Sequence, residues 1–431
     1  MKLIFLQRIS QALLLWSCLY APSTLAASEH PLRGQTQEVF DMVKDSVVQI
    51  RTLLKGSQSQ NSIGSGFYVS EDGLVVTNYH VVSSLAFQPQ TYVLEYVDSE
   101  DNHGELKLLA IDVLHDLALL QRKGKHLPYL RFHTNKIAKG ENLFSLGNPN
   151  DLGQVIIEGV NNGLREHSFY DAIHFSGAIN AGMSGGPVVS KIGEVVGVNE
   201  ASMGQSRGFL VPSEFAAKLV ARWRAHPVTV PKFRPEIARQ LKEHSAALTA
   251  RLTAKPFPVQ MDTGYAIPDS PDPYIRCWGN ESNMPKAFYS TRSFNCNGRA
   301  SVFVDDGMTL GDVYFSSSLY QTSTMDALRF GRVLERNYGR SDESSMDISS
   351  EDFTKYVCND SVVQLKGLSV KAVLCVRAYR QFPGLYDMRL KVVSLGKSKS
   401  ALISKLNLMG IAYDDGMRVV KFYMGALKWN G

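Results

Sequence analysis

A serine surrounded by glycines is the feature of this chain with the clearest chemical meaning. Ser184 stands in the run INAGMSGGP at positions 179–187, close behind an expected strand. Glycine lets the backbone turn sharply and approach a substrate carbonyl closely. That geometry presents a nucleophile and aims backbone N–H groups at a developing oxyanion. A run of this kind can also be an ordinary turn, so it needs support from other residues.

Two further residues have the types that a serine nucleophile needs. His80 ends an apolar run that begins at Leu74, and Asp116 stands at the start of another apolar run. The chain order His, Asp, Ser is the order of the chymotrypsin type of triad. In such a triad His80 takes the proton of Ser184 and returns it to the leaving amine, while Asp116 holds the imidazole in one tautomer. Taken singly, His80 could be a strand-end histidine and Asp116 a turn residue; together with Ser184 they predict catalysis.

The flanks of these residues resemble the trypsin-like serine peptidases of the HtrA/Deg type. Supporting runs are GSGFYV at 64–69, GNP at 147–149 with Gly153 and Gln154 after it, and GFLVP at 208–212. The resemblance covers about residues 36–225. It implies two six-stranded β-barrels with the site between them, His80 and Asp116 in the first barrel and Ser184 in the second.

The resemblance also implies roles for neighbouring residues. The N–H groups of Gly182 and Ser184 would form the oxyanion hole, and Met183 between them would pack or face a pocket. Trypsin-like relatives that select Lys or Arg carry an acid six residues before the serine, where this chain has Ala178. We therefore expect an uncharged pocket, lined by Ala178, Val198 and Phe209, for small or apolar residues. His115 and His174 flank the site and are expected to be structural, with no metal site.

Short apolar strands separated by Gly, Asn, Asp and Pro run from about Val47 to Pro212. Many short strands at even spacing are typical of a barrel or sandwich, so the fold class is mainly β. A short helix is expected over 35–45, and Ser213 is expected to cap a second helix.

The N-terminus has the pattern of a secretory signal peptide, residues 1–26. Lys2 and Arg8 precede an apolar stretch too short to span a bilayer, and small residues follow it. Cleavage is expected after Ala26, with Ala27 as the alternative. Lipidation at Cys18 is a weaker alternative, because Trp16 fits a lipoprotein motif poorly. The prediction is an exported protein, in a bacterial periplasm or secreted, with no transmembrane segment.

The remaining cysteines all lie beyond residue 276, and an even number of them in an exported chain predicts disulfides. Four cysteines allow three connectivities. We favour sequence neighbours, Cys277 with Cys296 and Cys358 with Cys375. A zinc site is the alternative, but close Cys-x-x-Cys pairs are missing.

Residues 226–273 are rich in proline and predict an exposed linker with a helix, since Ile237, Leu241, Leu248 and Leu252 recur at helical spacing. Residues 274–431, called the tail below, are expected to form a separate α+β domain, with a helix over 325–338 and a helix start at 349–352. The tail shows no evident PDZ carboxylate-binding loop, although HtrA/Deg peptidases usually carry PDZ domains. It could bind a partner, restrain the protease, tether it, or only stabilise it.

Composition limits the remaining choices. The net charge is +5, or +3 without Lys2 and Arg8, and the basic residues are scattered, which argues against a nucleic-acid partner. No nucleotide fingerprint occurs and the chemistry needs no cofactor. The sequence predicts an exported serine endopeptidase acting on polypeptides, with its oligomeric state open. The alternative is an envelope binding or quality-control module on a peptidase fold with little turnover.

Overall fold

The structure is a computed structural model that describes residues 34–149, 152–202, 208–227, 232–282, 288–339 and 351–430. The expected signal peptide and Cys18 lie outside these ranges. Among the helices in the described ranges, none combines the length and apolar character needed to cross a membrane.

Six antiparallel strands close into a first barrel in the order β1-β2-β3-β6-β5-β4. Every residue of β3 is buried, as expected for a short, continuously apolar strand inside a barrel. A helix, α2 (Tyr79–Phe87), follows β3 directly. The strands are β1 (Val47–Leu54), β2 (Gln60–Tyr68), β3 (Leu74–Thr77), β4 (Tyr92–Val97), β5 (His103–Asp112) and β6 (Leu117–Arg122).

A second closed barrel follows in the order β10-β11-β12-β9-β8-β7. The mainly β fold with two six-stranded barrels is therefore confirmed. The strands are β7 (Asn142–Gly147), β8 (Val155–Leu164), β9 (Ile173–Phe175), β10 (Pro187–Val189), β11 (Val195–Ser202) and β12 (Gly208–Pro212).

Two helices pack on the barrels. In α1 (Gln35–Val43), Val39 and Val43 enter a core that also contains Leu219 and Val220 of α3 (Ser213–Ala225). The predicted capping role of Ser213 is wrong: Ser213 is the first helical residue, Pro212 stands at the cap position, and no side chain caps the helix.

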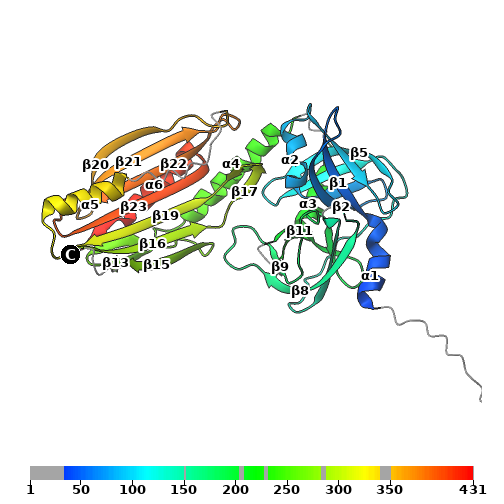
Figure 1. Ribbon diagram of the computed structural model, residues 1–431, viewed down its shortest axis with the longest axis horizontal. Helices are drawn as coiled ribbons and strands as arrows, with labels where there is room; N and C mark the ends of the chain where they lie inside the picture. Colours follow the sequence, from blue (N-terminus) through cyan, green and yellow to red (C-terminus); the bar gives the residue numbers. More distant parts are fainter. Residues whose placement is uncertain are drawn as a thin grey trace, which may run out of the picture. The chain divides into compact units, whose positions relative to one another are not determined.

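The helix predicted inside the linker is present as α4 (Arg234–Leu252), but the helix is not an exposed connector. Ile237 and Leu241 pack into the core of the first barrel, and Leu248 and Leu252 pack into the core of the tail. Figure 1 shows α4 running between these regions. The proline content indicated a linker, but the apolar positions of the helix are buried at both of its ends.

The tail is built on a seven-stranded antiparallel sheet in the order β15-β16-β19-β23-β22-β21-β20. Both favoured disulfides, Cys277–Cys296 and Cys358–Cys375, are present and are confirmed. Each joins directly opposite residues of neighbouring strands. The strands of this sheet are β15 (Ile275–Ser282), β16 (Ser290–Gly298), β19 (Val313–Gln321), β20 (Val357–Leu365), β21 (Leu368–Ala378), β22 (Leu385–Ser394) and β23 (Ser400–Ala412).

Helices cover both faces of this sheet. Leu319 and Leu402 pack in the core that contains α6 (Tyr413–Ala426), while their neighbours Tyr320 and Ile403 pack against α5 (Ala327–Gly339). This alternation follows from the two-residue period of a strand. A small sheet pairs β24 (Lys428–Trp429) of the tail with β14 (Tyr265–Pro268) and β13 (Val259–Asp262), so part of the predicted linker is strand.

The helix start expected at 349–352 is wrong for its described part. Glu351 and Asp352 lie in a turn that leads into β20. The carboxylate of Asp352 accepts a hydrogen bond from Gln381, and its carbonyl accepts one from the N–H of Arg380. These long-range contacts replace the local capping that the sequence suggested.

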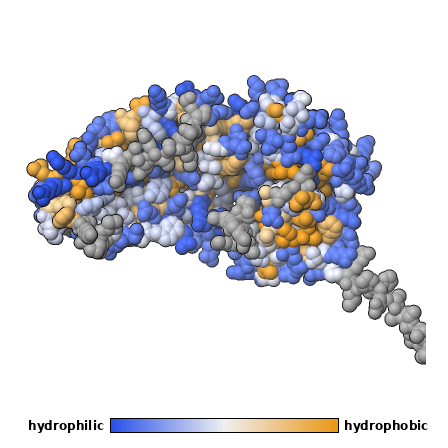
Figure 2. All heavy atoms as spheres, viewed as in Figure 1, coloured by the Kyte–Doolittle hydropathy of each residue, from blue (hydrophilic) through white to orange (hydrophobic). Residues whose placement is uncertain are grey.

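The tail and the first barrel share one hydrophobic core. A hairpin of β17 (Val302–Asp305) and β18 (Met308–Leu310), called the 302–310 hairpin below, contributes Val302, Val304 and Met308 to the core that contains α2. Figure 2 shows hydrophilic side chains over most of the visible surface, with hydrophobic groups gathered on the barrel half.

Candidate active site

His80 lies in the first turn of α2, three residues beyond the end of β3. The preceding Tyr79 is fully buried, and its N–H donates to the carbonyl of Asp116. The side-chain amide of Asn78 donates to the same carbonyl at 2.8 Å. These contacts hold the start of the helix against the residue that the sequence pairs with His80.

The carboxylate of Asp116 is aimed at His80. Asp116 has a φ of +52°, a left-handed conformation that non-glycine residues adopt uncommonly and that often marks a functional constraint. One carboxylate oxygen accepts the backbone N–H of His80 at 2.9 Å, and the other lies 2.6 Å from His80 Nδ1. This arrangement favours the tautomer that carries its proton on Nδ1 and leaves Nε2 free to accept a proton.

The surroundings of His80 favour its protonated form. Burial lowers the pKa of His80, but the charge and hydrogen bond of Asp116 raise it, and the carboxylates of Glu200 and Asp306 add to the rise. The net direction is upward. An imidazolium formed during a reaction is therefore stabilised at this position.

Glycines allow the loop of Ser184 to reach the first barrel. Gly185 has a φ of +85°, and a Cβ there would lie 2.2 Å from Thr77 Oγ1 and 2.3 Å from the carbonyl oxygen of Ser65. A Cβ on Gly186 would lie 2.2 Å from the carbonyl oxygen of Leu146. A larger residue at either position would move Ser184 away from His80.

Ser65 of β2 joins the two barrels at this point. It is fully buried, and its N–H donates to the carbonyl of Ser184 at 2.8 Å. Its hydroxyl donates to the carbonyl of Gly182 at 2.7 Å and accepts the N–H of Asn148 at 2.9 Å. The run GSGFYV marked this strand, but the sequence analysis gave Ser65 no role.

The two N–H groups expected to form the oxyanion hole are available. Within the described ranges, the N–H of Gly182 and that of Ser184 have no protein acceptor, whereas the N–H of Met183 between them donates to Asn180. Met183 itself is fully buried and packs in the second barrel. Free N–H donors beside a serine hydroxyl are what stabilisation of an oxyanion requires.

The hydroxyl of Ser184 points to a backbone carbonyl. It donates to the carbonyl of Glu200 at 3.3 Å, and among the described residues no hydrogen bond joins it to His80. The structure thus brings the three predicted residues together and forms the His80–Asp116 contact, but it leaves the Ser184–His80 hydrogen bond unformed. Such bonds often tighten only when a substrate is bound.

The predicted pocket residues differ in their exposure. Val198 is completely buried in the core, so it presents no surface to a ligand. Ala178 is exposed, and Phe209 is half-buried with the guanidinium of Arg165 4.6 Å from its ring centre. Their contribution to a substrate pocket remains a prediction.

The two flanking histidines have structural partners. His115 hydrogen-bonds the carboxylate of Asp112 and stacks on Phe215 at 3.9 Å, while His174 lies 5.8 Å from Phe209. One cluster in the described ranges has metal-ligand geometry, Asp269 with Cys277 and Cys296. Both of its sulfurs belong to a disulfide, so it offers no thiolate for zinc.

The tail reaches His80, a contact that the sequence did not predict. The ring of Phe303 in the 302–310 hairpin lies 6.0 Å from that of His80, edge to face. The hydroxyl of Tyr79 donates to the carbonyl of Val304 at 2.7 Å. Phe303 has no distinctive sequence context, so nothing local could have identified it.

Comparisons with known proteins find relatives of the barrel half. Residues 64–198 match the family described as trypsin-like peptidase domain. The chain is 33% identical over 216 residues to a probable periplasmic serine endoprotease DegP-like of Chlamydia muridarum, covering 46% of this chain and 42% of the relative. It is 31% identical over 210 residues to serine protease HTRA3 of Homo sapiens, covering 43% and 46%.

A solved structure, the serine endoprotease from Yersinia pestis, aligns with a TM-score of 0.40 and 24% identity, covering 46% of this chain and 69% of that one. The chain spans less than half the length of the two curated relatives. The expected resemblance to HtrA/Deg peptidases is confirmed for the barrel half.

Proposed function

We propose that this chain, which carries a trypsin-like peptidase domain, is a serine endopeptidase that cleaves polypeptides through Ser184, His80 and Asp116. The observation that carries the proposal is the 2.6 Å contact between His80 Nδ1 and Asp116, beside a serine whose neighbouring N–H groups are free. This combination supplies a base, a group that orients the base, a nucleophile and oxyanion donors.

The reaction proceeds through an acyl-enzyme. His80 Nε2 removes the proton of Ser184 as its oxygen attacks the scissile carbonyl, and the N–H groups of Gly182 and Ser184 stabilise the oxyanion. His80 then protonates the leaving amine, and a water molecule hydrolyses the acyl-enzyme by the same steps. Each oxyanion donor is worth about 3 kcal/mol of the barrier.

The site is proposed to accept small or apolar residues before the scissile bond. Ala178 places no charge where trypsin-like relatives carry an acid, and Phe209 is the half-buried aromatic nearby. Peptides with Val, Ala, Leu or Met at that position should be cleaved faster than those with Lys or Arg. A preference for Arg in a peptide-library digest would overturn this part of the proposal.

Export to an oxidising compartment, most simply the periplasm, is proposed from the signal-like residues 1–26 and from the two disulfides. Curated relatives carrying the word periplasmic in their names support it. Mass spectrometry of the purified, unreduced protein tests it: a mature N-terminus at Ala27 or Ser28 supports export, and four free thiols contradict it.

The alternative is a binding or quality-control module with little turnover. One observation favours it: the hydroxyl of Ser184 hydrogen-bonds Glu200 and not His80. A fluorophosphonate probe separates the alternatives. Labelling of the wild type with loss in Ser184→Ala supports the enzyme, and peptide turnover should fall by at least roughly 10⁴-fold in that variant. Equal labelling of both proteins removes Ser184 from its role.

A further inference from the structure

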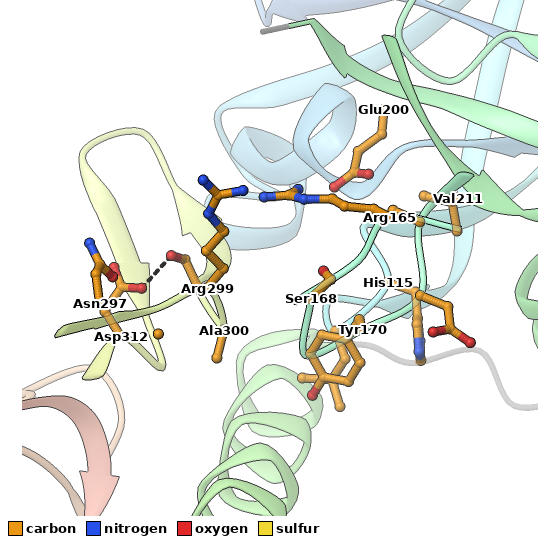
Figure 3. Close-up of a pocket in the computed structure, with 15 residues that line it drawn as sticks. His115, Arg165, Ser168, Tyr170, Glu200, Val211, Asn297, Arg299, Ala300 and Asp312 are labelled. Atoms are coloured by element: carbon orange, nitrogen blue, oxygen red, sulfur yellow. Dashed lines mark hydrogen bonds between the residues drawn. The ribbon is translucent and has the colours of Figure 1, made fainter. Parts of the chain in front are cut away.

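A polar pocket of about 420 Å³ lies where the second barrel and the tail meet. It is lined by Arg165 and Ser168 of the loop after β8, by Glu200 of β11, and by Arg299 and Ala300 of the tail. Figure 3 shows the guanidinium groups of Arg165 and Arg299 pointing toward each other from opposite walls. Two like charges in one pocket repel each other unless a counter-charge lies between them.

Three carboxyl groups also line the pocket, those of Asp171, Glu200 and Asp312, but none of them lies within ion-pair distance of either guanidinium group in the described ranges. Neither guanidinium forms an ion pair within the described ranges, and Arg165 Nε is buried without a hydrogen-bond partner. Burial and the proximity of Arg299 lower the pKa of Arg165. Leaving a buried donor of a charged group unpaired is costly, which indicates a place for an external acceptor.

Figure 3 shows the carboxyl group of Glu200 on the side of the pocket that carries Arg165, and its charge acts on that arginine. Burial and the nearby Asp116 raise the pKa of Glu200 to about 7, against the influence of Arg165. Glu200 is therefore partly protonated at neutral pH and neutralises the arginines only in part. Its side chain reaches the pocket because residue 200 is the extra residue of a bulge between β11 and β12.

The pocket is adjacent to the reacting serine. The carbonyl of Glu200 accepts the hydrogen bond of Ser184, while the Glu200 side chain lines the pocket. Arg165 also lies over the ring of Phe209. We expect Phe209 to line the pocket for the substrate residue that precedes the scissile bond. We therefore place the pocket beside the substrate residues that are N-terminal to the scissile bond. The free C-terminal carboxylate of a polypeptide substrate lies on the other side of that bond, so it cannot be the group that the pocket binds.

We propose that Arg165 and Arg299 form a subsite for an acidic side chain, Asp or Glu, of the polypeptide substrate, N-terminal to the scissile bond. This inference rests on the proposed peptidase function and adds the substrate class. A carboxylate can receive two parallel hydrogen bonds from a guanidinium group, and such charge-assisted bonds are about twice as strong as neutral ones. Because Arg299 belongs to the tail, the tail would take part in substrate selection.

The test uses the full-length protein and pairs of fluorogenic peptides that differ only in Glu or Gln at one of the second to fifth positions before the scissile bond. At one position the Glu peptide should have a kcat/KM at least about tenfold higher. Arg165→Gln and Arg299→Gln should remove that preference while Gln peptides are still cleaved. Arg332→Gln, at an exposed position of α5, is the matched control and should keep the preference.

A binding measurement tests the subsite independently of the peptidase function. In Ser184→Ala, the Glu peptide should bind at least about tenfold more tightly than the Gln peptide by fluorescence anisotropy, and Arg299→Gln should abolish the difference. Cleavage without any Glu preference would overturn the subsite and leave the peptidase function standing. Absence of cleavage together with an arginine-dependent Glu preference in binding would overturn only the peptidase function. Equal binding of the two peptides would overturn the subsite.

Discussion

The two barrels share one topology but differ in how they are joined to the rest of the chain. The first barrel has a core that continues into α4, the 302–310 hairpin and Phe382. The second barrel has one core drawn from its own segments and a second core that it shares with the first barrel, α1 and α3. Its loop of residues 167–170 hydrogen-bonds α4 and the tail. The barrel that carries His80 and Asp116 therefore shares a continuous core with the tail, whereas the barrel that carries Ser184 meets the tail through one loop, whose Phe169 packs on Tyr274 at 5.1 Å.

This difference indicates where the tail can act on the chemistry. A shift of the 302–310 hairpin would reach His80 directly through Phe303 and Tyr79. Its route to Ser184 is less direct, through the contacts between the barrels and through the loop that hydrogen-bonds Arg299. The tail thus supports His80, the residue that we propose as the general base, and the expectation of an exposed linker between independent units does not describe the packing of α4.

The strongest test of this difference between the barrels is to replace one buried phenylalanine in each core with alanine. Phe382 and Phe175 are both fully buried, and Phe382 meets Phe87 of α2 edge to face at 6.0 Å. Each Phe→Ala change should lower the free energy of unfolding by about 3–5 kcal/mol. Hydrogen exchange should rise in the tail and the first barrel together for Phe382→Ala, but in the second barrel for Phe175→Ala. Unchanged exchange in the first barrel of Phe382→Ala would refute the shared core.

A second test removes the joint between the barrels. Ser65→Ala loses the hydrogen bonds of the hydroxyl to Gly182 and Asn148, so it should cost about 1–3 kcal/mol and displace the oxyanion donors. We expect kcat for peptide cleavage to fall more than the affinity for substrate. The matched control is Ser190→Ala, because Ser190 is equally buried but its hydroxyl has no partner in the described ranges. Equal kinetics of the two variants would mean that Ser65 does not position the site.

The parts of this structure that could be predicted are those where chemistry demands particular residue types in a local frame. Ser184 needs glycines beside it because Gly185 and Gly186 have no room for a Cβ, and that requirement is visible in nine consecutive residues. The disulfides could be predicted because sequence neighbours face each other across hairpins. The short apolar strands predicted a barrel or a sandwich, and the resemblance to HtrA/Deg peptidases implied the two six-stranded barrels.

The parts that escaped prediction depend on residues of ordinary type brought together from far apart. Arg299 meets Arg165 across 134 positions of the sequence, and Phe303 meets His80 across 223. The apolar positions of α4 predicted a helix, but they did not predict that Gln240 is buried. Its side-chain amide accepts a hydrogen bond from the N–H of Val113 and donates one to the carbonyl of Ile111, both next to or in β5 of the first barrel. The burial of this polar residue depends on the packing of α4 against the first barrel, which the sequence of the predicted linker does not specify.

A third test weakens the attachment of the hairpin without removing it. Tyr79→Phe deletes the hydrogen bond to the carbonyl of Val304 and should lower the free energy of unfolding by about 1 kcal/mol. Tyr274→Phe is the control, since the Tyr274 hydroxyl is buried without a partner among the described residues. Its removal should leave stability unchanged or raise it. Chemical denaturation measures both, and an equal loss in the two variants would show that the hairpin contact contributes nothing.

The smallest expected effect is a change in the pH dependence of activity. His80 must be neutral to accept the proton of Ser184, so kcat/KM should rise with pH through the pKa of His80. The carboxylates of Glu200 and Asp306 both raise that pKa. Removing either charge, by Glu200→Gln or Asp306→Asn, should therefore lower the pKa and move the acidic limb of the profile to lower pH.

The shifts of the pH profile in the two variants should differ in size and in salt dependence. Glu200 is half-buried on the second barrel, whereas Asp306 is exposed at the tip of the 302–310 hairpin, where solvent and salt screen its charge. The shift for Asp306→Asn should thus be the smaller and should vanish at high ionic strength, while that for Glu200→Gln should persist. Asp414→Asn, an exposed charge of α6, is the control and should leave the profile unchanged. An acidic limb that stays in place in Asp306→Asn at low salt would mean that the tail supports His80 by packing alone.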